Sequence, residues 1–394
     1  MSTDYRPSRR GFLSSGIALP AAAAAAGSQL RYGVLGKTGL KVTRLGFGCV
    51  TISDPSVIAR ALDMGINFFD TARKYQGGNS ERLLGAALKG RRKEAIVETK
   101  SEAPTKDAAL KELDASLKEL STDYVDIWLL HAKHKPAELK DELLEAQRIA
   151  KQQGKIRFAG VSTHVGLSMI PYLQKLGQTD VILVSYNFSM PPEMGMEKTI
   201  ESARQAGIGI IAMKTMAGGY RRVQNWNDDA SGIEQGDDRA VFIDPRVMMK
   251  KQKEPGATAA ALRWVLKNRD VDTAIIGIVD VDQLEEDFAA MSAPFTDADQ
   301  KMLVAQLDRI GPLYCRMCGA CTGKCSQGLP VADMLRVLTY ADGYGQFPLA
   351  RESFQELGER AAQARCTDCP VCTIQCPNGV RVAERIRKAQ EWLA

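Results

Sequence analysis

The sequence predicts an α/β chain: a parallel (β/α)8 TIM barrel followed by a smaller, mainly α-helical module. Eight short apolar runs alternate with segments of helical periodicity, and they cover residues 43–49, 66–70, 95–100, 125–131, 156–162, 181–187, 209–214 and 273–277. A β/α alternation of that number favours a closed barrel over an open sheet. The module is indicated by the cysteines, because eight of the nine follow residue 314.

The length, composition and charge of the chain limit the classes of protein to which it can belong. The chain has 394 residues, 45% hydrophobic and 25% charged, which is ordinary for a globular protein and long enough for a barrel plus a module. The formal net charge of +5 includes +2 from residues 1–28. The remaining balance does not favour a nucleic-acid partner.

The N-terminal segment, residues 1–28, looks like an export signal. Ser8-Arg9-Arg10-Gly11-Phe12-Leu13 precedes an uncharged, alanine-rich run that ends near Ala26, and this resembles a twin-arginine signal. The run is too short for a stable membrane span. The resemblance implies a periplasmic protein, or a cytoplasmic one if the signal does not function; a weakly helical tail is the alternative.

The barrel is expected over residues 30–305. Residues 30–42 contain turn signals at Gly36 and Gly39, so we expect a hairpin that closes the bottom of the barrel. Amphipathic helices are expected between the strands at residues 106–120, 141–153, 196–206 and 258–267, and after the last strand at 281–291. Residues 218–254 form the longest insertion, in a position that usually shapes substrate choice.

Three successive predicted strands end in an ionisable residue. Asp70 ends the second strand, with Tyr75 five residues later, and Lys100 and His131 end the next two. Parallel barrels keep their chemistry at the carboxyl ends of strands, so these four side chains should meet there. Carbonyl reduction needs a proton donor beside the developing alkoxide. The alternative for each residue alone is that it anchors a loop.

The order Asp, Tyr, Lys, His, in the contexts Asp70-Thr71-Ala72, Thr99-Lys100 and Leu130-His131, resembles the catalytic tetrad of aldo-keto reductases. The resemblance covers residues 30–305 and implies that Tyr75 donates the proton. Lys100 would then lower the pKa of Tyr75, Asp70 would hold Lys100, and His131 would orient the substrate oxygen.

The same resemblance implies a nicotinamide cofactor, NAD or NADP, at the later strand ends. The residues assigned to it are Ser162, Thr163, Tyr186, Asn187, Lys214, Gly277, Asp280, Gln283, Glu286 and Asp287. Lys214 would pair with the pyrophosphate. Acidic residues after Gly277 would repel the 2′-phosphate of NADP, which favours NAD. The alternative is that Asp280 and Asp282 cap the following helix.

The cysteines form two equal sets, each spaced C-x2-C-x2-C-x3-C: Cys315, Cys318, Cys321 and Cys325, then Cys366, Cys369, Cys372 and Cys376. This spacing resembles bacterial two-cluster ferredoxins and predicts two [4Fe-4S] clusters within residues 306–394. The resemblance assigns Cys315, Cys318, Cys321 and Cys376 to one cluster and Cys366, Cys369, Cys372 and Cys325 to the other. Zinc and disulfides are the alternatives.

The sequence therefore predicts an oxidoreductase that moves hydride between a nicotinamide and a small carbonyl or alcohol substrate. Its clusters would exchange electrons with an external carrier. An iron–sulfur electron-transfer protein that uses the barrel as a scaffold is the second hypothesis. The sequence makes no prediction of oligomeric state.

Overall fold

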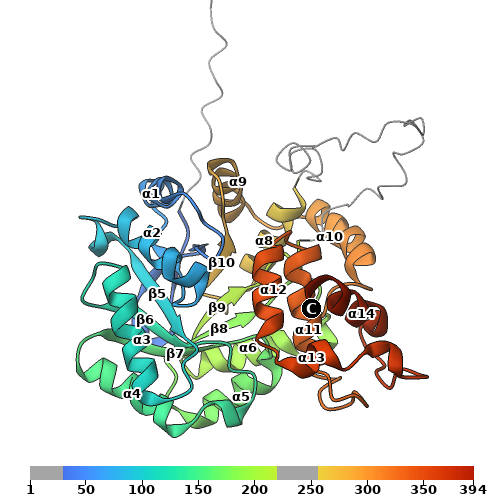
Figure 1. Ribbon diagram of the computed structural model, residues 1–394. Helices are drawn as coiled ribbons and strands as arrows, with labels where there is room; N and C mark the ends of the chain where they lie inside the picture. Colours follow the sequence, from blue (N-terminus) through green and yellow to red (C-terminus); the bar gives the residue numbers. More distant parts are fainter. Residues whose placement is uncertain (1–29, 220–255) are drawn as a thin grey trace, which may run out of the picture.

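The computed structural model describes residues 30–219 and 256–394, so the predicted signal at 1–28 and most of the 218–254 insertion lie outside the described residues. Eight parallel strands close into a barrel in the order β10-β3-β4-β5-β6-β7-β8-β9 (Figure 1). Their bounds are β3 Leu45–Gly48, β4 Phe68–Asp70, β5 Ile96–Ser101, β6 Val125–Leu130, β7 Ile156–Thr163, β8 Val181–Ser185, β9 Gly209–Met213 and β10 Thr273–Gly277. All eight predicted strands are confirmed.

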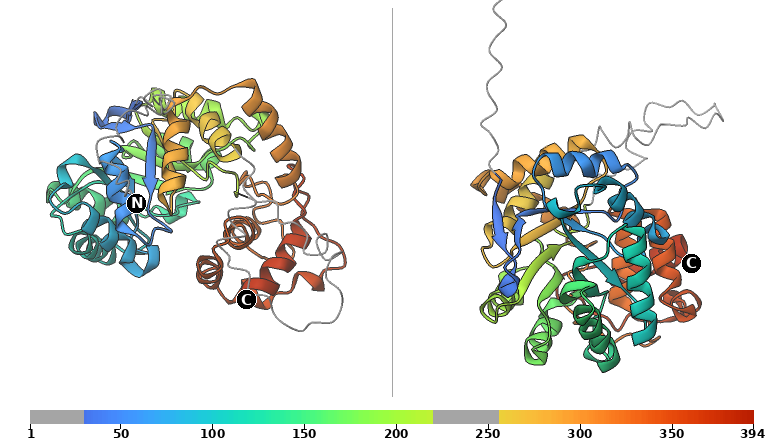
Figure 2. Two further views of the ribbon diagram at one scale, coloured as in Figure 1. Left: turned by 90° about the horizontal axis from the view of Figure 1, so that it is seen from above. Right: turned by 90° about the vertical axis from the view of Figure 1, so that its left-hand side faces the viewer.

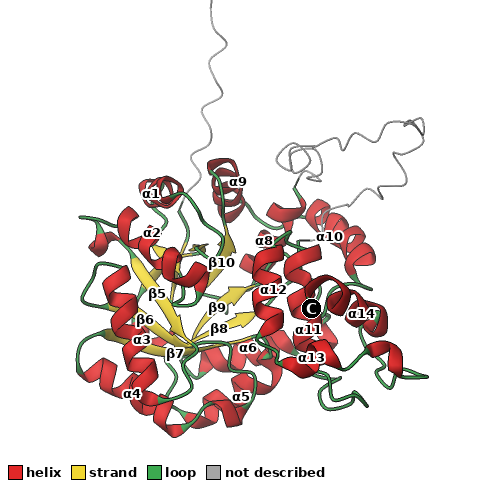
Figure 3. Cartoon of the chain, in the orientation of Figure 1, coloured by secondary structure: helices red, strands yellow, loops and turns green. Residues whose placement is uncertain are grey.

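Helices surround the strands, as Figure 3 shows. The barrel helices are α1 Pro55–Asp63, α2 Asn79–Ala87, α3 Lys106–Glu119, α4 Asp141–Gln152, α5 Gly166–Leu176, α6 Met196–Gln205, α8 Ala257–Lys267, α9 Val281–Ser292 and α10 Asp297–Ile310. Their apolar faces and the outer faces of the strands form one core, which includes Trp128, Leu130 and Val265. A second cluster, with Phe68, Leu129 and Ile211, fills the barrel interior.

The predicted hairpin covers the amino-terminal ends of the strands. Strands β1 Tyr32–Val34 and β2 Lys41–Thr43 pair antiparallel. The buried carboxylate of Asp272 accepts hydrogen bonds from the N–H groups of Gly36 (3.2 Å) and Ile210 (2.9 Å), which ties the turn to the barrel. A Cβ on Gly36 would lie 2.3 Å from the backbone nitrogen of Gly209, so glycine is required there.

The cysteine-rich part is mainly helical, with α11 Val331–Asp342, α12 Phe347–Gln355, α13 Glu359–Gln363 and α14 Val382–Leu393. It has its own core, with Leu338 of α11, Phe354 of α12 and Ile386 of α14. It lies beside the barrel in two perpendicular views (Figure 2). The boundary expected at residue 305 falls inside α10, which packs on α8, so the structural transition follows Ile310.

The two parts are joined at the carboxyl ends of the strands. Asn187, just after β8, donates a hydrogen bond to the Tyr314 hydroxyl at 3.0 Å. Arg316 donates to the carbonyl oxygens of Ser189 and Asn378. The helical module therefore sits on the end of the barrel where its chemistry is expected. Within residues 30–219 and 256–394, no helix is long and apolar enough to cross a membrane.

Candidate active site

Local structure brings the four predicted catalytic residues to one place. Asp70 is the last residue of β4, Lys100 lies near the end of β5 and His131 follows β6. Tyr75 begins a short 3-10 turn whose next residue, Gln76, has φ of 53°. The Gln76 amide donates to the carbonyl of Ile52 at 2.8 Å, so this turn is fastened to the segment after β3.

Lys100 is the centre of a buried charge cluster. Its side chain is fully buried; it donates hydrogen bonds to the Asp70 carboxylate and, at 2.7 Å, to the carbonyl oxygen of Thr71. Burial alone would lower the pKa of Lys100, but Asp70, Tyr75 and Glu98 raise it. Lys100 is therefore charged at neutral pH, as the tetrad requires.

Glu98 is a member of this cluster that sequence reasoning missed. It pairs in register with Asp70, and its Oε1 lies 3.7 Å from Lys100 Nζ. Neither of its buried carboxyl oxygens has a hydrogen-bond partner among the described residues. Burial raises the pKa of Glu98 well above its usual value, although the nearby Lys100 lowers it. Its position two residues before Lys100, on the same face of β5, was the available signal.

Tyr75 and His131 stand beside the cluster. Lys100 Nζ lies 5.1 Å from the centre of the Tyr75 ring, and the rings of Tyr75 and His131 are 5.7 Å apart in an edge-on arrangement. Burial raises the pKa of Tyr75 by more than Lys100 lowers it, although the lowering by Lys100 agrees with what the resemblance implied. Burial also lowers the pKa of His131, with help from Lys100, so its ring is neutral.

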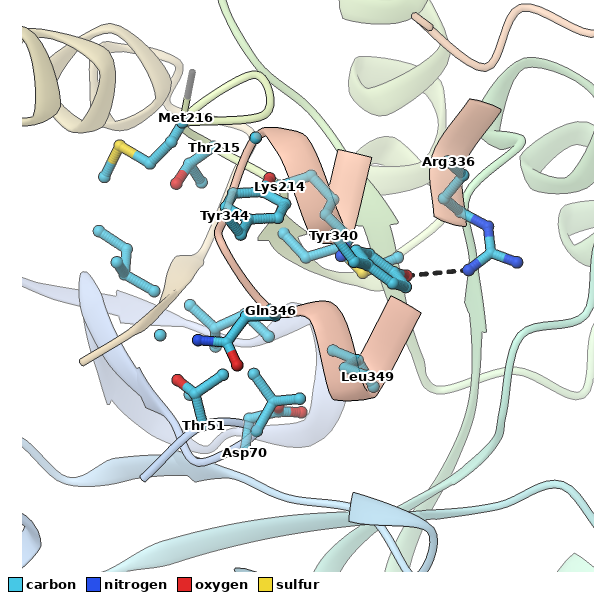
Figure 4. Close-up of a pocket in the computed structure, with 18 of the residues that line it drawn as sticks. Thr51, Asp70, Lys214, Thr215, Met216, Arg336, Tyr340, Tyr344, Gln346 and Leu349 are labelled. Atoms are coloured by element: carbon cyan, nitrogen blue, oxygen red, sulfur yellow. Dashed lines mark hydrogen bonds between the residues drawn. The ribbon is translucent and has the colours of Figure 1, made fainter. Parts of the chain in front are cut away.

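A cavity of about 990 Å³ opens above these residues and is walled by both parts of the chain. Asp70, Tyr75 and His131 line it from the barrel, whereas Arg336 and Tyr340 line it from α11. Figure 4 shows Lys214, Tyr340 and Arg336 together on the side opposite Asp70. Sequence reasoning placed no functional residue on α11, although Arg336 and Tyr340 have the spacing of one helical face.

Six of the ten residues assigned to the cofactor line this cavity: Ser162, Lys214, Gly277, Gln283, Glu286 and Asp287. Lys214 faces the module, because its Nζ lies 4.3 Å from the ring centre of Tyr340. His164, which the sequence left without a role, also lines the cavity and is 2.9 Å from the Ser185 hydroxyl through its Nδ1.

The other four residues assigned to the cofactor lie elsewhere. The hydroxyl of Tyr186 contacts Glu197 and Asn268, and its ring packs on Trp264 at 5.0 Å, outside the barrel lumen. Thr163 accepts a hydrogen bond from the N–H of Val165.

Asn187 is buried in the joint with the module, where it also donates to the carbonyl of Lys214 at 3.0 Å. Asp280 caps α9 by accepting from the N–H of Gln283 at 2.8 Å, as the alternative interpretation expected.

None of the eight clustered cysteines forms a disulfide, and neither does Cys49. Burial raises the pKa of the Cys315 thiol to about 12, and the neighbouring thiols of Cys321, Cys318 and Cys376 contribute to this. For Cys366, burial again raises the pKa, and the contributing thiols are Cys372, Cys369 and Cys325. No group of three or more Cys, His, Asp or Glu side chains in the described part of the chain is arranged for a single metal ion.

The fold and this site define a barrel enzyme whose chemistry lies at the carboxyl ends of its strands. Residues 53–308 match the Aldo/keto reductase family. The chain belongs to this family, and it is an oxidoreductase of that kind.

Curated relatives and solved structures agree with this. The chain is 30% identical over 285 residues to L-galactose dehydrogenase of Arabidopsis thaliana, covering 66% of this chain and 87% of the relative. It is 26% identical to the NADH-specific methylglyoxal reductase of Escherichia coli, covering 68% of this chain and 96% of that one. The fold matches the holo form of aldo-keto reductase AKR11C1 from Bacillus halodurans, with a TM-score of 0.56 and 24% identity. The match covers 70% of this chain and 96% of that one.

Proposed function

We propose that the protein reduces a small carbonyl compound with a nicotinamide cofactor, and that Tyr75 donates the proton. The observation that carries this is the grouping of Tyr75, His131, Lys100 and Asp70 at one end of a cavity. The cavity volume of about 990 Å³ is at the upper end of the usual range for ligand sites, so it fits a dinucleotide together with a small substrate.

Each residue of the tetrad has a separate role in the proposed reduction. A nicotinamide supplies hydride to the carbonyl carbon when it is bound. The neutral ring of His131 donates a hydrogen bond that orients the carbonyl oxygen, and the Tyr75 hydroxyl gives its proton to that oxygen. Lys100, held by Asp70, stabilises the phenolate that remains. At neutral pH the buried Tyr75 hydroxyl keeps its proton, which is the state that proton donation requires.

Glu286 and Asp287 would lie beside the adenosine end of the cofactor, with Gly277 and Gln283. Their carboxylates favour NADH over NADPH, because a 2′-phosphate would be repelled. The relative named as an NADH-specific methylglyoxal reductase makes methylglyoxal with NADH the first pair to assay. Tighter binding of NADPH in a direct comparison would contradict this preference.

We further propose that the module is ferredoxin-like and holds two [4Fe-4S] clusters, which exchange single electrons with an external carrier. Two sets of thiols support the ligand assignment: Cys315 with Cys318, Cys321 and Cys376, and Cys366 with Cys369, Cys372 and Cys325. Thiolates of one cluster bind four different iron atoms, so they need not converge on a single point. The N–H of Met317 and the amide of Asn378 point at thiol sulfurs, Cys315 and Cys318, at 3.4 Å each.

Export through the twin-arginine route is part of the same proposal, because that route carries folded proteins with their cofactors inserted. The decisive measurement is anaerobic purification from the native compartment, with iron, sulfide and bound nicotinamide determined together. About eight irons per chain with bound NAD would support an exported redox enzyme. Iron without nicotinamide would favour the alternative, an electron-transfer protein with a scaffold barrel.

Substitution of Tyr75 by phenylalanine tests the catalytic assignment. Loss of a general acid should lower kcat for methylglyoxal by about 100-fold to 10,000-fold, with iron content unchanged. Tyr32→Phe is the matched control, because that ring is 41% exposed on the hairpin at the far end of the barrel. Unchanged turnover in the Tyr75 variant would remove Tyr75 as proton donor.

A further inference from the structure

Two cations meet inside the cavity, one from each part of the chain. Lys214 follows β9 of the barrel, and Arg336 belongs to α11 of the module. Both converge on one phenol: Arg336 Nη1 donates to the Tyr340 hydroxyl at 2.8 Å, and Lys214 Nζ lies 4.3 Å from the centre of its ring (Figure 4). The side chains of two segments that are distant in the sequence thus form a single polar group.

This group has little negative charge to balance it. Lys214 pairs with no carboxylate in the part of the chain that the structure describes. Among the carboxylates of the described residues, Arg336 pairs only with Asp333, at 3.4 Å, and the side chain of Asp333 is 32% exposed. The buried Nε of Arg336 donates no hydrogen bond to any described residue. Two neighbouring cations in a partly dry site favour an anion.

Four other carboxylates around the cavity already have partners. Asp70 holds Lys100, and Lys74 pairs with both Glu102 and Glu356. Glu138 accepts a hydrogen bond from the N–H of His134 at 2.7 Å. These carboxylates satisfy other partners and do not neutralise the group around Tyr340.

Tyr340 adds little negative charge to balance Lys214 and Arg336. Burial would raise the pKa of Tyr340, but Arg336 and Lys214 outweigh it and lower the value to about 8. A protonated Tyr340 hydroxyl accepts from Arg336 and can donate its own hydrogen to a ligand, and it leaves Asp333 as the only carboxylate among the described residues that pairs with either cation.

We propose that Lys214, Arg336 and the Tyr340 hydroxyl form a subsite for an anionic group, a carboxylate or a phosphate, on the carbonyl substrate. The subsite and the reacting end share one cavity, because Lys214, Arg336 and Tyr340 line it together with Tyr75 and His131. The substrate is then a short carbonyl compound with one anionic end. This inference rests on the carbonyl reduction proposed above.

The test compares a charged ligand with a neutral one of similar shape, phenylglyoxylate and its methyl ester, using the full chain with its native cofactors. Calorimetry reports binding without turnover. We expect the acid to bind at least about tenfold more tightly than the ester. Arg336→Met and Lys214→Met should each weaken the acid by about tenfold to a hundredfold and change the ester by less than about twofold.

Three comparisons make the result specific. Arg336→Lys should restore part of the preference, because the charge is kept while the planar fork is lost. Lys74→Met removes a cavity cation that already has two carboxylate partners, so the ratio of acid to ester should stay within about twofold. Iron content and circular dichroism must match the wild type in every variant.

Equal binding of acid and ester by the wild type would overturn the subsite, as would equal weakening of both ligands in the variants. Weaker NADH binding by Lys214→Met, with acid binding unchanged, would assign Lys214 to the cofactor and also overturn it. A comparison of glyceraldehyde 3-phosphate with glyceraldehyde repeats the binding test for a phosphate group. If only one of the two ligand pairs shows tighter binding of its charged member, that pair identifies the anion as a carboxylate or a phosphate. A charge preference in calorimetry without any Tyr75-dependent reduction would sustain the subsite and refute the proposed reaction.

Discussion

The buried cluster around Lys100 predicts an asymmetric response to removing its partners. In Lys100→Met, Asp70 keeps a carboxylate that is 3% exposed and has lost its cation. Breaking a buried ion pair from one side costs about 3–5 kcal/mol, and the described residues offer no second cation in hydrogen-bond contact with Asp70. Lys100→Met should therefore lower the free energy of unfolding by about that amount.

Asp70→Asn should cost less, because Glu98 can take over the pair. Glu98 Oε1 lies 3.7 Å from Lys100 Nζ, where the attraction of an ionised carboxylate is about 4 kcal/mol at an effective dielectric constant of 20. Ionising this buried carboxyl costs several kcal/mol, so we expect a net loss of about 1–2 kcal/mol. Adding Glu98→Gln to Asp70→Asn removes the substitute partner and should bring the loss to about 3–5 kcal/mol.

The assay is urea unfolding under anaerobic conditions, followed by tryptophan fluorescence. Trp128, in β6, is buried in the barrel core and reports on the part that holds the cluster. Glu98→Gln alone is the matched control and should change the free energy of unfolding little at pH 7, because burial raises the pKa of Glu98 and so disfavours its charged form. An equal loss of stability in Asp70→Asn and Lys100→Met would contradict a role for Glu98 as the substitute partner. So would the absence of any further loss when Glu98→Gln is added to Asp70→Asn.

Three further outcomes follow from the structure. Ultraviolet difference titration of the wild type should show one tyrosine ionising near pH 8, and Tyr340→Phe should lack it. Burial raises the pKa of Asp272 to about 6, so the folded chain favours the protonated side chain. The stabilisation from this protonation is complete below about pH 4 and is lost as pH rises through 6. In Asp272→Asn, the free energy of unfolding should therefore vary less with pH over that window. Glu356→Gln should lower the free energy of unfolding by less than about 1 kcal/mol in thermal unfolding, because its ion pair with Lys74 is half exposed. A larger loss of stability would mean that this ion pair holds the module in place.

The sequence predicted the barrel and the catalytic grouping because both depend on local patterns. An apolar strand followed by an ionisable residue fixes where Asp70, Lys100 and His131 emerge, and a closed parallel sheet brings those ends together. Tyr186 shows where the pattern is insufficient. It also follows a strand, yet its side chain points outward to Trp264, because residues at a strand end alternate between the two faces.

The roles of Arg336 and Tyr340 were beyond sequence reasoning for a different reason. Helical spacing reveals that the two share a face of α11, but it does not reveal which surface that face meets. That information lies in contacts between distant segments, such as Asn187 with Tyr314. Likewise, the inward direction of Glu98 was readable from its spacing to Lys100, whereas its lack of hydrogen-bond partners was not.

The shared wall of the cavity affects how the enzyme matures. The barrel alone supplies a floor, and helices α11 and α12 supply the roof, so neither part has a complete site of its own. The complete cavity therefore forms only when the cysteine-rich part of a newly made chain has folded onto the barrel. Formation of the whole site is in this way tied to the folding of the module.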